Sequence, residues 1–167
     1  MGAAASEHEL KGLRAPQVLH IATHGFFQPS NARQVPTENP LLRSGLAFAG
    51  ANAGESRGED GILTALEAAN LDLWGTRLVT LSACDTGIGV VRNGEGVYGL
   101  RRAFFLAGAE TLVMSLWPVS DLVTREMMSG YYSGLKDGLG RSTGRASFRL
   151  ANGRTLPVSG KRLNRAF

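Results

Sequence analysis

The chain has 167 residues, the size of one ordinary domain. Hydrophobic residues make up 43% and charged residues 19% of the sequence, a composition that excludes wholesale disorder. Its single cysteine excludes an internal disulfide and a multi-cysteine zinc site. No apolar stretch approaches the roughly 20 residues of a membrane helix, and no signal peptide opens the chain, so we expect a cytoplasmic protein without a membrane anchor.

The basic charge is confined to the C-terminal end. The formal net charge is +4, but the segment from Arg141 to Phe167 holds seven basic residues and no acid. The rest of the chain has 11 basic and 14 acidic residues, so it is mildly acidic. Because the basic segment also has few aromatic residues for stacking on bases, we do not expect nucleic-acid binding.

The N-terminal half alternates short apolar runs with loops. Residues 1–15 are small and polar, and we expect an approach segment there. The apolar run at 18–22 predicts a buried strand that runs into Thr23-His24-Gly25. The next predicted elements are a loop at 28–40, an extended segment at 41–49, a loop at 50–61 and a short helix at 64–70, opened by a capping box of Thr64 and Glu67.

The second half continues with strands and helices in alternation. RLVTLSA at 77–83 is almost continuously apolar, which predicts a strand covered on both faces. Residues 95–107 predict a helix that Gly108 can end, because apolar side chains recur along one side. A third strand at 111–116 and a helix from Ser120 or Asp121 complete the pattern. This order predicts an α/β domain, a mainly parallel sheet with helices on its faces.

The last part of the chain does not follow this pattern. Residues 143–167 have closely spaced glycines, a proline and like charges, and they show no sustained alternation. We therefore predict three parts: an N-terminal approach segment at 1–15, a domain at 16–142 and a basic, disordered tail at 143–167.

Two predicted strands run into residues with catalytic chemistry. His24 follows the first strand and Cys84 follows the strand at 77–83. The carboxyl ends of parallel strands are where sites collect in open α/β sheets. An imidazole beside a thiol favours the nucleophilic thiolate and can then protonate the leaving amine. The backbone N–H groups of Gly25 and Cys84 are candidates for the oxyanion hole.

Each residue also has a structural interpretation. A lone cysteine is most often a small buried hydrophobe, and a loop histidine is most often hydrogen-bonded. Because both residues lie at strand ends beside glycine-bearing turns, the catalytic and the structural interpretations are equally favoured for the pair. Asp85 and Asp121 are candidates to line a pocket for a basic substrate side chain, with Trp117 as its wall. We prefer turn formation for Asp85 and helix capping for Asp121 over a role of either acid in the pocket.

Two further motifs suggest ligands but lack the required context. Gly94-Glu95-Gly96-Val97-Tyr98-Gly99 is a literal G-x-G-x-x-G, but its first glycine does not close a strand, so we interpret it as a helix entry and expect no cofactor. His20 and His24 form an H-x-x-x-H pair without a third ligand. We therefore expect no metal and interpret His20 as a hydrogen-bonded core histidine.

Several long blocks of the sequence resemble one family. They are VLHIATHGFF, NPLLRSGLAFAGAN, DGILTALEAANLDL, LVTLSACDTG, NGEGVYGLRRAFFLAGA and SLWPVSD, in that order, within Leu10 to Ser142. Thr23-His24-Gly25 and Ser82-Ala83-Cys84-Asp85-Thr86-Gly87 resemble the His-Gly and Ala-Cys motifs of caspase-like cysteine peptidases. As a whole, the chain resembles the CHAT domain, the caspase-like module found with tetratricopeptide repeats in bacteria.

The resemblance implies a three-layer α/β/α caspase-haemoglobinase fold and a Cys–His dyad at Cys84 and His24. It also implies hydrolysis of a protein or peptide substrate and a tetratricopeptide-repeat region in the parent protein or a partner. The family pattern has further strands and a helix before the first strand seen here, and an apolar helix and aromatic strand after Ser142. We expect both to be missing, so the alternative function is a catalytically inactive, truncated interaction module.

Overall fold

A computed structural model describes residues 5–28, 39–52, 58–82, 95–114 and 121–138, together with the short strands at 148–149 and 155–156. The chain divides into two compact units, Met1–Pro118 and Val119–Phe167. The boundary between them lies inside the segment 16–142 for which the sequence predicts one domain.

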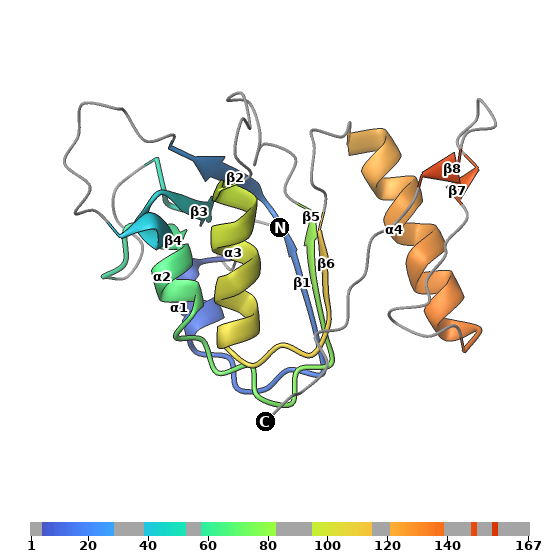
Figure 1. Ribbon diagram of the computed structural model, residues 1–167, viewed down its shortest axis with the longest axis horizontal. Coiled ribbons are helices and arrows are strands. Elements are labelled where there is room, and N and C mark those ends of the chain that lie inside the picture. Colours follow the sequence, from blue (N-terminus) through green and yellow to red (C-terminus); the bar gives the residue numbers. More distant parts are fainter. Residues whose placement is uncertain are drawn as a thin grey trace. The chain divides into compact units, whose positions relative to one another are not determined.

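A three-stranded parallel sheet is the centre of the first unit. Its strands are β1 (Val18–Ala22), β5 (Leu78–Ser82) and β6 (Leu112–Met114), in the spatial order β1-β5-β6 (Figure 1). The sequence predicts each of these strands, and their parallel pairing confirms the α/β class. Parallel neighbours need crossover connections, and the residues between β5 and β6 include helix α3 (Glu95–Leu106).

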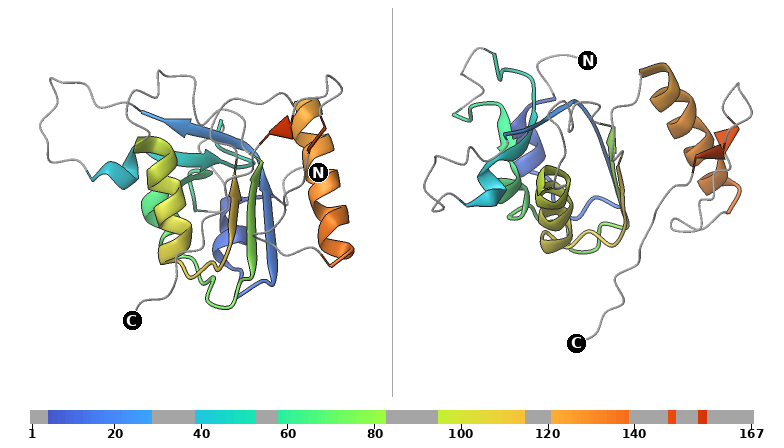
Figure 2. Two further views of the ribbon diagram at one scale, coloured as in Figure 1. Left: turned by 45° about the vertical axis from the view of Figure 1, so that its right-hand side comes forward. Right: turned by 45° about the horizontal axis from the view of Figure 1, so that its top comes forward.

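A second sheet in the same unit is antiparallel. It consists of β2 (His24–Phe27), β3 (Ser44–Ala47) and β4 (Ile62–Thr64), in that order. The sequence did not predict a strand at 24–27, but its prediction of a first strand at 18–22 is confirmed. That strand ends at Ala22, and after a bend at Thr23, His24 begins β2 and joins the other sheet (Figures 1 and 2).

Short helices precede and follow the antiparallel strands. α1 (Glu7–Lys11) lies in the predicted approach segment, whose composition does not indicate a helix; the Ser6 hydroxyl caps it by accepting the N–H of Glu9. α2 (Ala65–Ala68) starts at the predicted capping box of Thr64 and Glu67. A single 3₁₀ turn, η1, spans Pro40–Leu42.

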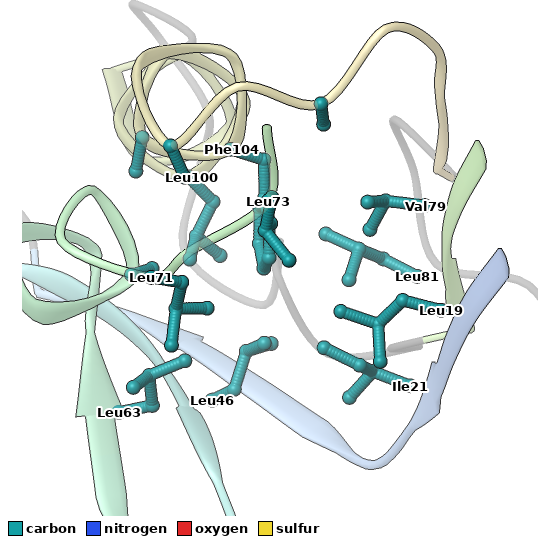
Figure 3. Packing of buried hydrophobic residues seen from close by; sticks show 14 of the residues in the cluster. Leu19, Ile21, Leu46, Leu63, Leu71, Leu73, Val79, Leu81, Leu100 and Phe104 are labelled. Carbon is teal, nitrogen blue, oxygen red and sulfur yellow. The ribbon is translucent and has the colours of Figure 1, made fainter. Parts of the chain in front are cut away.

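The buried core of the first unit lies between the two sheets and α3 (Figure 3). Alternate residues of β1 and β5 point to this side, because successive strand side chains face opposite ways. Each fully buried side chain of this size contributes about 1.5–3 kcal/mol. The contributors that Figure 3 labels are Leu19, Ile21, Val79 and Leu81 from the parallel sheet, Leu46 and Leu63 from the antiparallel sheet, Leu100 and Phe104 from α3, and Leu71 and Leu73 from the connection after α2.

The second unit contains α4 (Asp121–Lys136), the helix predicted from Ser120 or Asp121. Within residues 143–167, where the sequence predicts a disordered tail, β7 (Phe148–Arg149) and β8 (Thr155–Leu156) form a two-stranded antiparallel pair. Among the described residues, no helix combines the length and the apolar character that a membrane span requires.

Candidate functional site

The last residues of β1 and β5 lie side by side at the carboxyl edge of the parallel sheet. The strands pair in parallel, and their last residues, Ala22 and Ser82, are register partners. Neighbouring strands lie about 4.8 Å apart. His24 is two positions beyond Ala22, and Cys84 is two positions beyond Ser82. The segments that lead to the two predicted catalytic residues therefore start from adjacent points.

His24 lies where the chain passes from the parallel to the antiparallel sheet. It is exposed and pairs with Ala47 of β3. The preceding hydroxyl, on Thr23, donates a hydrogen bond to the carbonyl oxygen of Ala47. Because both Thr23 and His24 are tied to the same residue of β3, the start of β2 is held on both sides of the Thr23–His24 peptide bond.

The backbone N–H of Gly25 is directed away from β3. In an antiparallel pair, hydrogen-bonded and non-hydrogen-bonded residue pairs alternate. The N–H of Gln28 donates to the carbonyl of Arg43 at 2.8 Å, which makes that pair hydrogen-bonded. Counting back along the register, Gly25 and Leu46 are a non-hydrogen-bonded pair. The N–H of Gly25 thus points to the edge of β2 that pairs with no strand among the described residues, as an oxyanion-hole donor would require.

His20 has a polar partner at the end of the neighbouring strand. Its Nε2 lies 2.9 Å from Oγ of Ser82. Burial of part of the ring lowers the pKa of His20, so the imidazole is neutral near pH 7. The residue as a whole is exposed, so the prediction of a core histidine is wrong, although the predicted hydrogen bonding is confirmed. The sequence did not predict this pair, because its two residues lie 62 positions apart on separate strands.

The other predicted site residues lie outside the described part of the chain or have undescribed side chains. Cys84, Asp85 and Trp117 fall in the first group, and Asp121, the first residue of α4, in the second. The dyad distance and the pocket therefore stay predictions.

A partly buried charge cluster joins α1 to α2 and to the segment before β4. Nζ of Lys11 lies 2.6 Å from Oε1 of Glu7, 2.8 Å from Oε2 of Glu59 and 3.0 Å from Oε1 of Glu67. Glu7 is fully buried, and its Oε2 accepts the backbone N–H of Gly61 at 3.0 Å. Sequence reasoning missed this cluster because its members come from separate segments.

The ionisation of this cluster follows from burial and pairing. Burial raises the pKa of Glu7, and the opposing effect of Lys11 is smaller. Burial alone would lower the pKa of Lys11, but hydrogen bonds with the three carboxylates outweigh it and raise that pKa. Oxygens of the three acids lie within 4.8 Å of one another, a spacing suitable for a metal ion. The Lys11 ammonium contacts all three, so it acts as their counter-ion.

The last glycine of the G-x-G-x-x-G motif has a packing role. Gly99 lies in α3, and a Cβ atom there would come within 2.6 Å of Oγ of Ser44, the first residue of β3. Ser44 is buried, so the hydroxyl has little room to move. This contact agrees with the interpretation of the motif as part of a helix entry.

The fold and the paired strand ends define an α/β domain with a histidine at the carboxyl edge of a parallel sheet. The CHAT domain family model matches residues 1–152, so the chain belongs to the CHAT domain family. This match extends beyond Leu10 to Ser142, the limits of the sequence resemblance.

Two curated relatives are both called Tetratricopeptide repeat protein 28, from Mus musculus and from Homo sapiens. Each is 36% identical to this chain over 78 residues. The aligned segment covers 47% of this chain and 3% of each relative. The chain thus corresponds to a small part of these long proteins.

Proposed function

We propose that this CHAT domain is a caspase-like cysteine endopeptidase in which His24 and Cys84 form the catalytic dyad. The observation that carries the proposal is the register of Ala22 with Ser82, since each partner is followed two positions later by one dyad member. Membership in the CHAT domain family supports the same assignment. We also propose that the two sheets and their helices belong to a caspase-like α/β/α arrangement.

The reaction starts with transfer of the Cys84 thiol proton to the His24 imidazole. The thiolate then attacks the carbonyl carbon of the scissile peptide bond, and the oxyanion accepts hydrogen bonds from the N–H groups of Gly25 and Cys84. Collapse of this intermediate breaks the C–N bond, while the protonated His24 gives its proton to the leaving amine. Water, deprotonated by His24, hydrolyses the thioester and restores the thiol.

The substrate is a protein or peptide, and we propose that Asp85 and Trp117 line its pocket. An acid in that pocket would select a basic side chain next to the cleaved bond. Because Cys84 must stay a free thiol, the reducing cytoplasm is the compartment that suits this chemistry. We propose a tetratricopeptide-repeat region as the partner, since the curated relatives carry that name.

A peptide-library cleavage assay tests the proposal. We expect turnover by the wild-type chain and its loss in both Cys84→Ser and His24→Ala. His8→Ala is the matched control, because it removes an exposed histidine from α1 and leaves the site untouched. Turnover that survives Cys84→Ser would refute the dyad. Absence of turnover together with undiminished binding to a repeat-domain partner would support the alternative, an inactive interaction module.

A further inference from the structure

The parallel sheet has a side-chain contact that crosses from β1 to β5 near the catalytic edge. His20 and Thr80 are register partners, as are Ala22 and Ser82. Nevertheless, Nε2 of His20 lies 2.9 Å from Oγ of Ser82. The imidazole thus reaches diagonally, one side-chain repeat toward the carboxyl end of the sheet.

We infer that His20 and Ser82 are positioning residues that hold the two dyad-bearing strand ends in register. The inference rests on the proposed function of His24 and Cys84. His20 precedes His24 by four positions, and Ser82 precedes Cys84 by two. The contact therefore joins the two segments that carry the proposed base and the proposed nucleophile.

The contact lies next to the last described pair of the ladder between β1 and β5. The described ladder between β1 and β5 ends at Ala22 and Ser82. Beyond it, Thr23 and His24 are bound to Ala47 of the antiparallel sheet. The final pair of the described ladder is thus where the strand that leads to Cys84 is tied to the strand that leads to His24. A displacement of about 1 Å between catalytic groups is enough to reduce rates strongly.

The chemistry of the contact suits positioning and not proton transfer. The pKa of His20 is lowered by burial, so the ring is neutral near pH 7 and adds no charge beside the dyad. A neutral imidazole and a hydroxyl form a directional hydrogen bond whose polarity depends on the tautomer. A neutral amide of similar reach should therefore replace the imidazole.

The test uses the chain's single cysteine, because iodoacetamide can then alkylate no other thiol. The rate of alkylation is measured against pH, which gives the pKa of the Cys84 thiol. We expect Ser82→Ala and His20→Phe each to raise that pKa and to slow alkylation at pH 7 about five-fold, the order expected for one neutral hydrogen bond. The double variant should be no slower than either single variant.

Three matched variants separate positioning from folding and from the dyad itself. His20→Gln should restore the wild-type profile. Val18→Ala, which removes an exposed side chain from the same face of β1, should leave the profile unchanged. His24→Ala should raise the thiol pKa if the dyad exists. Urea unfolding of each variant tests whether a changed alkylation profile comes from a loss of the fold.

The possible results are distinct. If His24→Ala changes the profile but Ser82→Ala and His20→Phe do not, the positioning role is refuted and the dyad stands. If His24→Ala has no effect, the proposed dyad fails, and the positioning role fails with it. A loss that appears in His20→Phe and His20→Gln but not in His24→Ala would make His20 the base and overturn both assignments.

Discussion

Replacing Lys11 with methionine is the sharpest test of the partly buried charge cluster. The substitution keeps an unbranched apolar side chain on α1 but removes the ammonium that contacts Glu7, Glu59 and Glu67. Three carboxylates then remain within 4.8 Å of one another without their counter-ion. We expect a clear loss of folding free energy at pH 7.

The size of the loss follows from the exposure of the three acids. Breaking a buried ion pair by removing one partner costs about 3–5 kcal/mol. The Glu7 side chain is 0% exposed, but those of Glu59 and Glu67 are 30% and 37% exposed, so water screens part of their repulsion. We therefore expect the lower end, about 3 kcal/mol. With a urea dependence of about 2 kcal/mol per M, the unfolding midpoint should fall by about 1.5 M.

Urea unfolding followed by circular dichroism measures this loss. Arg14→Met is the matched control, because Arg14 is 70% exposed and lies 3.8 Å from Asp72, a pair worth at most about 1 kcal/mol. Adding Glu7→Gln to Lys11→Met should recover part of the stability. Since burial raises the pKa of Glu7, its protonated form favours the fold, so the deficit of Lys11→Met should shrink as the pH falls toward that raised pKa. Equal midpoints for Lys11→Met and Arg14→Met would refute the reasoning.

Three further predictions concern packing, capping and pH. Gly99→Ala should destabilise the fold by about 1–3 kcal/mol in thermal or urea unfolding, because the new Cβ atom would come within 2.6 Å of Oγ of Ser44. Combining Gly99→Ala with Ser44→Ala should relieve this clash. Thr64→Ala should cost about 1 kcal/mol through loss of the capping box, whereas Thr64→Ser should cost less, and equal losses would contradict the capping role. Because the pKa of His20 is lowered in the folded chain, the unfolded chain binds a proton first as the pH falls below 6.5, and stability declines there. His20→Gln should therefore flatten the decline of the melting temperature with falling pH. An unchanged slope would count against this role of His20.

Local patterns in the sequence were sufficient to predict those helices and strands whose formation depends on their own residues. The apolar run at 77–83 predicts β5, because a strand covered on both faces is apolar almost throughout. The runs at 18–22 and 111–116 likewise predict β1 and β6, although β1 buries only alternate residues. The capping box predicts the start of α2, because its hydrogen bonds join residues three positions apart. Gly108, with a φ of 107°, ends α3 as predicted, since glycine adopts this conformation without strain.

Other features depend on residues far apart in the chain. α1 has five residues and would be marginal alone; it is held by Glu7 and Lys11, whose partners are about 50 positions away. The break between β1 and β2 at Thr23 likewise depends on Ala47, a residue of another strand. Neither partner is visible from the local sequence.

For the candidate site, the sequence by itself identified His24 and Cys84 through their positions after apolar runs. Only the tertiary structure showed that Ala22 and Ser82 are register partners, that the N–H of Gly25 points away from β3, and that His20 contacts Ser82. The physical reason is that strand order and register are set by the packing of the two sheets and α3 around a shared core. Residue type and spacing along the chain determine which chemistry is present, and this packing decides which groups meet.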